Sequence, residues 1–156
     1  LSLHQKCQCF IGPAYMILQK YGLSNIFWIA VGFSYIFLGV AAYAIITLPE
    51  NTFDGKNQEH VLAAVKLNYV RLSLATLCMV TYPLMFFISL NFVKYVTIAL
   101  TAWAIAIYID DYLVLYQIIA YPERGIVVFM QFIRPFFLVC LLWMSFELTF
   151  RSTDLD

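Results

Sequence analysis

The chain has 156 residues, of which 63% are hydrophobic and only 12% are charged. Soluble domains are about 45–50% apolar and about 25% charged, so this composition excludes an ordinary soluble domain and indicates a membrane protein. The formal net charge is zero. Its lysines and arginines form no cluster, which excludes the basic surfaces that bind nucleic acid or anionic lipid.

Residues 1–24 are of mixed polarity, and we interpret them as an N-terminal interfacial arm. Pro13 can open a short helix and Gly22 can close it, because proline suits a first helical turn and glycine suits the position after the last one. A short helix at the membrane surface is one interpretation of this arm. An irregular arm is the alternative.

The arm also contains the motif H-x-x-C-x-C, formed by His4, Cys7 and Cys9. Imidazole and thiolate are ligands that zinc and copper accept, so these residues are a candidate metal site. Three ligands in a short arm are a weak pattern. Palmitoylation of a cysteine next to the membrane is a second interpretation, and cysteines without a special role are a third.

Four apolar segments follow the arm, and each is long enough to cross a hydrocarbon core of about 30 Å as a helix. They cover residues 26–48, 61–90, 95–121 and 126–150, and a polar tail covers residues 151–156. The predicted fold class is an all-α membrane protein. It is a four-transmembrane-helix bundle over residues 25–150 with a short interfacial N-terminal segment.

The first apolar segment contains no charged residue, and Ser24 or Asn25 can cap its helix. Gly32, Gly39 and Ala42 fall on one face at helical spacing. Small side chains at such positions let two membrane helices approach closely. The sequence therefore predicts that another helix packs against this face.

The connections between the segments predict how the helices are ordered and oriented. Residues 50–60 form the one clearly polar loop, which we expect to be the most mobile internal segment. Residues 91–94 make a very short turn, so the second and third segments should be antiparallel neighbours. Lysine and arginine are enriched in cytoplasmic loops. One side of the predicted bundle would carry Lys6, Lys20, Lys94 and Arg151, and the other Lys56, Arg124 and, if it counts as a flank, Lys66. This distribution places both termini on the cytoplasmic or equivalent side.

Charged residues inside the apolar segments lie at matching depths. Arg71, Asp111 and Arg134 each fall about ten residues from the same predicted side, which at 1.5 Å per residue is some 14–15 Å. With Asp110, they give one intramembrane layer of two arginines and two aspartates. Asp110 points about 100° away from Asp111 on a helix, so we expect it to meet a different partner.

Each of these segments also carries a stripe of small and polar residues that leads to its charge. The stripes are Asn68, Arg71, Ala75, Cys78 and Tyr82 in the second segment, Thr97, Thr101, Ala104, Tyr108 and Asp111 in the third, and Gln131, Arg134 and Ser145 in the fourth. We therefore predict that the stripes face inward and that Asp111 pairs with Arg134, Arg71 or both.

Three interpretations of this layer stay open. Buried ion pairs can fix which helices pack together. Alternatively, the third segment ends near Ile109, which would place both aspartates at the interface. The third interpretation is a site for an ion, a proton or an anionic substrate. Pro135 favours it slightly, since a proline in a helix leaves a backbone carbonyl unpaired.

The sequence contains no catalytic motif, so an enzyme has no positive evidence. Its two histidines, His4 and His60, lie outside the apolar segments, so the chain cannot ligate a haem by paired histidines between membrane helices. No cofactor is required by the sequence, although bound lipid is expected.

Three functions are compatible with these observations. The first is a small subunit or assembly component of a larger membrane complex, with membrane lipids and other integral-membrane subunits as partners. The second is a transporter or channel protomer that uses the Arg/Asp layer. The third is a membrane enzyme or a binder of a lipophilic cofactor such as a quinone or pigment, for which aromatic residues, among them Trp28, Trp103 and Trp143, could supply the contacts.

Overall fold

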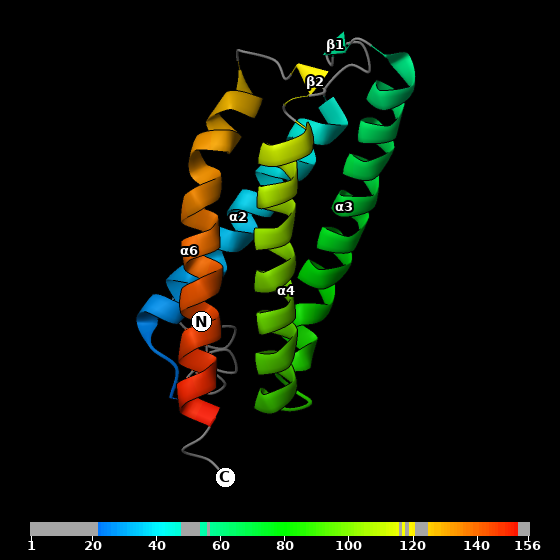
Figure 1. Ribbon diagram of the computed structural model, residues 1–156. Helices are drawn as coiled ribbons and strands as arrows, with labels where there is room; N and C mark the ends of the chain where they lie inside the picture. The colour runs from blue at the N-terminus through cyan, green and yellow to red at the C-terminus, as the bar shows by residue number, and fades with distance from the viewer. Residues whose placement is uncertain are drawn as a thin grey trace, which may run out of the picture.

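A computed structural model describes residues 22–47, 54–55, 57–115, 117, 119–120 and 125–152. In chain order its elements are α2 (Asn25–Thr47), β1 (Asp54–Gly55), α3 (Gln58–Met85), α4 (Leu90–Asp110), the π-helical segment η2 (Asp111–Leu115), β2 (Ile119–Ala120) and α6 (Ile126–Ser152). The four long helices pack side by side as a bundle (Figure 1). The predicted all-α, four-helix fold is confirmed.

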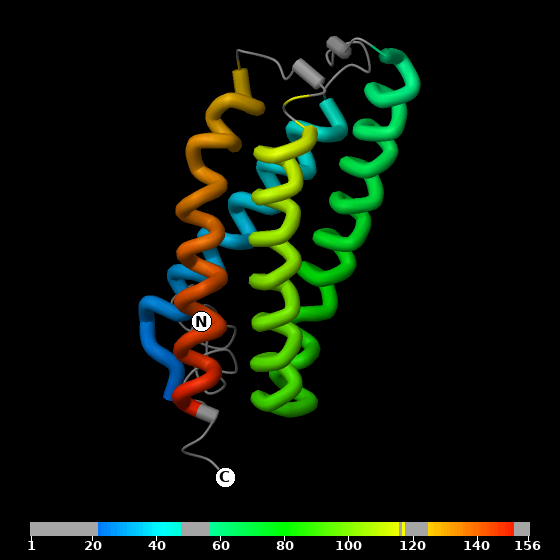
Figure 2. The backbone as a smooth tube through the Cα atoms, viewed as in Figure 1, coloured from blue at the N-terminus to red at the C-terminus, as the bar shows by residue number. Residues whose placement is uncertain are grey.

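All four long helices have the length and apolar composition needed to cross a membrane, with η2 extending the third span to Leu115. They run alternately up and down, so the start of α2 and the end of α6 lie at the same end of the bundle (Figure 2). At the opposite end, β1 and β2 pair as an antiparallel two-stranded sheet that joins two connections between helices. The side of the membrane that faces each end stays a prediction.

The turn between α3 and α4 covers residues 86–89, a few residues before the turn expected at residues 91–94. Ser89 takes an extended backbone conformation (φ −167°, ψ 139°), and the helix starts at the next residue. At the other end of α3, Asn57 accepts a hydrogen bond from the backbone N–H of Glu59 and caps the helix. Residues 58–60 of the expected polar loop are therefore the first turn of α3.

The best-packed part of the bundle lies at the end that holds the start of α2 and the end of α6. Helix α6 packs along both α2 and α4, whereas α3 makes fewer contacts with the rest. Among the described residues, the largest fully buried side chains are Phe27, Val93, Thr97 and Leu148. Phe27 and Phe86 meet edge-to-face, with ring centroids 6.4 Å apart. This packing fixes α2, α4 and α6 relative to one another.

The expected close approach of a helix to the glycine face of α2 is wrong for the part of the chain that the structure describes. A Cβ atom added at Gly32 or Gly39 would meet nothing within 4 Å. The buried face of α2 is instead formed by Phe27, Ala30, Ser34 and Ala44. Because Ala30, Ser34 and Ala44 are also small, they satisfy the need for close packing, and the two glycines face outward.

Candidate ligand-binding cavity

A buried cluster of ion pairs joins three helices near the end of the bundle that holds β1 and β2. Asp111, at the start of η2, has a side chain only 7% exposed. Its Oδ1 lies 2.6 Å from Nη1 of Arg71 on α3, and its Oδ2 lies 2.7 Å from Nη1 of Arg134 on α6. The predicted ion pair is confirmed as a buried one, and Asp111 pairs with both arginines; its depth in the membrane stays a prediction.

Asp110 belongs to the same cluster but lies on its outer side. Its Oδ2 is 3.2 Å from Nη2 of Arg71, and its side chain is 54% exposed. The expectation that Asp110 meets a different partner from Asp111 is therefore wrong. The planar guanidinium of Arg71 presents two terminal nitrogens and reaches both carboxylates at once.

The cluster lies nearer to the end of the third span than the sequence indicated. The described part of that span ends at Leu115, four residues after Asp111, and β2 begins at Ile119, so fewer than ten residues of the span can follow Asp111. Nevertheless Asp111 is buried, and the helical span continues past Ile109 to Leu115, so the interpretation that ends the third segment near Ile109 is not supported. The backbone N–H of Asp111 contacts the carbonyls of both Ile107 and Tyr108, where the α-helix changes to a π-helix. The residue pattern does not predict this change of helix type. Short π-helical turns are frequent at functional sites.

The polar stripes of the sequence face inward, as predicted. On α3, the residues Asn68, Arg71, Ala75, Cys78 and Tyr82 all line one partly open cavity between the helices. Thr97 and Ala104 on α4 line it too, as does Asp111 at the start of η2. Thr101 and Ser145 bind each other at 2.7 Å and join α4 to α6. The ring of Tyr108 lies against the guanidinium of Arg134, whose central carbon is 5.2 Å from the ring centroid.

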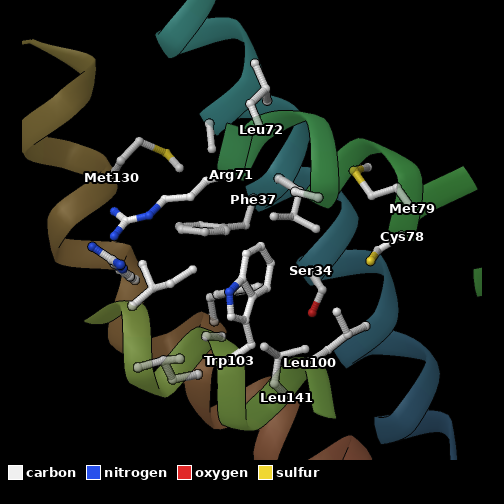
Figure 3. A pocket seen from close by; sticks show the side chains of 18 of the residues that line it. Ser34, Phe37, Arg71, Leu72, Cys78, Met79, Leu100, Trp103, Met130 and Leu141 are labelled. Carbon is white, nitrogen blue, oxygen red and sulfur yellow. The ribbon is translucent and has the colours of Figure 1, made fainter. Parts of the chain in front are cut away.

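This cavity has a volume of about 300 Å³ and is lined by side chains of all four helices. One end is polar and is formed by Asn68, Arg71, Asp111, Gln131 and Arg134. The remaining wall is mainly apolar and aromatic. Figure 3 shows the indole of Trp103 pointing into this space, with Phe37 and Arg71 on one side and Leu100 and Leu141 on the other. The cavity is therefore amphipathic, with its charge confined to one end.

The structure also reveals a second buried carboxylate that the sequence analysis missed. Glu147 on α6 accepts hydrogen bonds from the backbone N–H (2.5 Å) and the hydroxyl (2.6 Å) of Ser24 and from Nε1 of Trp143 (3.1 Å). Arg151 lies 4.0 Å away. Ser24 also accepts a hydrogen bond from the N–H of Phe27, so it is the residue that caps α2. The sequence does hold a signal for this site: Glu147 is a lone acid in an apolar segment, and Trp143 and Arg151 lie four residues to either side of it.

The described residues contain no group of three or more His, Cys, Asp or Glu side chains that could hold a metal ion. His4, Cys7 and Cys9 lie outside the described residues, so the metal or palmitoylation site in the arm stays a prediction.

Comparisons of the chain with protein-family models, with curated proteins and with solved structures give no match. Function is therefore inferred from the geometry of the cavity and its charged end.

Proposed function

We propose that this multi-pass membrane protein binds a lipophilic small molecule in the cavity inside its helix bundle. The observation that carries the proposal is a cavity of about 300 Å³ with an apolar, aromatic wall and a few polar groups at one end. Small-molecule sites in proteins have this form and range from about 300 to 1,000 Å³.

The energetics of packing support an occupant of this kind. Protein interiors are close-packed and contain few voids larger than a water molecule. The apolar side chains that line the cavity gain dispersion contacts from an apolar occupant, whereas water finds too few polar groups there. A lipophilic molecule restores those contacts. Since α3 makes the fewest contacts of the four long helices, its separation from α2 or α4 would be the least costly route of entry from the bilayer.

Two other functions stay predictions. A transporter or channel protomer would use the same layer of charges, but Arg71 and Arg134 both meet Asp111 there. A subunit of a larger complex would bury apolar side chains that are exposed on the perimeter of the bundle, which lipid can cover equally well. Native mass spectrometry after gentle extraction separates these functions, because it detects unrelated protein partners, a homo-oligomer or a bound small molecule by mass.

Fluorescence quenching by a brominated ligand tests the proposal directly. Trp103 lines the cavity, whereas Trp28 and Trp143 do not. Dodecanol with a terminal bromine, added to the protein in lipid nanodiscs, should quench Trp103 saturably, and the saturable component should be lost in Trp103→Phe. Brominated dodecanol that only dissolves in the surrounding lipid would quench the other tryptophans, and this quenching would not saturate.

A cavity-filling variant provides the second half of this test. Ala104 lines the cavity, so Ala104→Phe should weaken saturable binding about tenfold or more. Ala106→Phe is the matched control, because Ala106 is exposed on the outer face of the same helix. Equal binding by the two variants, or quenching of the wild type that never saturates, would contradict the proposal.

A further inference from the structure

The charged end of the cavity is not electrically balanced on its inner side. Arg71, Arg134 and Asp111 line the cavity, but Asp110 does not. Asp110 is half exposed and contacts the cluster only through the outer nitrogen of Arg71. The charged side chains that face the cavity are therefore two cations and one anion, and together they carry a formal charge of +1.

The excess positive charge belongs to Arg134 rather than to Arg71. Arg71 divides its two terminal nitrogens between two carboxylates. Arg134 meets only Oδ2 of Asp111, whose Oδ1 is taken by Arg71, and the ring of Tyr108. It has no other polar partner among the residues that the structure describes. A guanidinium has five N–H donors in a planar fork, so the described residues leave most donors of Arg134 to a further anion.

Two neutral amides lie at the same end of the cavity. The side chains of Asn68 and Gln131 line it, and neither forms a hydrogen bond with a described residue. Gln131 precedes Arg134 by three residues on α6, so the two side chains lie on the same face of that helix. Their amide N–H groups are donors for the oxygen atoms of an anionic head group.

The apolar part of the cavity extends away from this end. Trp103 is eight residues before Asp111 on α4, which at 1.5 Å per residue is about 12 Å along the helix. Its indole points into the cavity (Figure 3). A molecule whose head lies at Arg134 would therefore lay its chain past Trp103.

Building on the function proposed above, we infer that the ligand is a monoanionic amphiphile, with a carboxylate head at Arg134 and an alkyl chain in the apolar part of the cavity. A single negative charge neutralises the +1 of the inner wall. A carboxylate matches the planar fork of a guanidinium, which can bind both oxygens at once. A head group with two negative charges would overcompensate the wall and repel Asp111.

The test compares ligands that differ only in the head group. Dodecanoate, dodecanol and dodecyl phosphate, each with a terminal bromine, are titrated into nanodiscs of zwitterionic lipid at an alkaline pH that ionises the carboxyl group. Quenching of Trp103 is measured. We expect the carboxylate to bind about tenfold tighter than the alcohol, and also tighter than the phosphate. In Arg134→Gln the ratio of the carboxylate and alcohol Kd values should fall toward one. Arg134→Lys, which keeps the charge but not the fork, should retain part of the preference.

Arg151→Gln is the matched control, because it removes the same charge from the same helix at the opposite end of the bundle and should keep the full preference. Saturable binding without preference for the carboxylate, or with a preference that Arg134→Gln leaves intact, would overturn the inference while leaving the proposed function standing. Tightest binding of the phosphate would overturn the carboxylate assignment. The absence of saturable binding by any of the three ligands would refute the proposed function itself.

Discussion

Removal of the Asp111 carboxylate should destabilise the bundle more than removal of either neighbouring charge. In Asp111→Ala, Arg134 loses its only carboxylate among the described residues, whereas Arg71 keeps Asp110 at 3.2 Å. An arginine cannot escape by losing its proton near neutral pH. Breaking a buried ion pair from one side costs about 3–5 kcal/mol in soluble proteins. That is a large fraction of a typical stability of about 5–15 kcal/mol.

Two other variants in the cluster should be milder, for reasons that the geometry supplies. Arg134→Leu leaves Asp111 paired with Arg71 at 2.6 Å. It removes one charged interaction, which contributes roughly 1.5–3 kcal/mol, and the apolar replacement offsets part of that loss. Asp110→Ala removes an exposed partner, for which about 0–1 kcal/mol is expected. In the double variant Asp111→Asn with Arg134→Gln, no charge is left unpaired at these positions, so part of the stability lost in Asp111→Ala should return.

The assay is the free energy of unfolding in mixed micelles of increasing sodium dodecyl sulfate content, followed by circular dichroism. The expected order of destabilisation is Asp111→Ala, then Arg134→Leu, then Asp110→Ala. Equal stability of Asp111→Ala and Asp110→Ala would refute the view that the buried pairs hold the helices together. Normal folding of Asp111→Ala and Arg134→Leu with loss of ligand binding in both would assign the cluster to function alone.

Further predictions concern the rest of the bundle. Ser24→Ala removes the cap of α2 and the hydroxyl hydrogen bond to the buried carboxylate of Glu147, so it should lower stability by about 1–3 kcal/mol in the same unfolding assay. The backbone N–H of residue 24 still donates to Glu147 after this change, so an effect beyond that range would contradict the assignment. Gly39→Leu should change the free energy of unfolding by less than about 0.5 kcal/mol, since a side chain there meets open space. If a protein that copurifies with the wild type is lost in this variant, the hypothesis of a subunit in a larger complex is favoured. Thr101→Val removes a hydrogen bond between α4 and α6 and should cost about 1 kcal/mol, with an unchanged midpoint as the contrary result. Single cysteines at Gln58 and Thr153, in a background without native cysteines, should be labelled from opposite sides of the membrane, and labelling from one side would contradict four spans.

The number of spans and the partners of the charges could be predicted from sequence because both follow from simple physical constraints. A long apolar segment with few charges has few alternatives to a membrane helix. Charges within such segments must face a protein interior or pair with one another. Helical periodicity indicates on which face of its helix each charged residue lies. The pairing of Asp111 with Arg71 and Arg134 therefore followed from matched depth and shared polar stripes.

Other features depended on tertiary geometry that periodicity does not contain. Asp110 shares Arg71 because the length and fork of that side chain let it reach both carboxylates, which a helical wheel does not show. Helix α2 has small residues on two faces, so the sequence does not show which face contacts the other helices. Ala30, Ser34 and Ala44 form the contact face, and the glycines face outward. The cavity itself was not predicted, since its volume depends on how the helices are spaced.

Anomalous X-ray diffraction from crystals grown with the terminally brominated dodecanoate tests the central claim most directly, because it locates the bromine without reference to any functional assay. We expect a bromine peak inside the bundle beside Trp103, with electron density for the carboxylate at Arg134. Bromine peaks confined to the outer, lipid-facing surface of the helices, with no density inside the bundle, would contradict it.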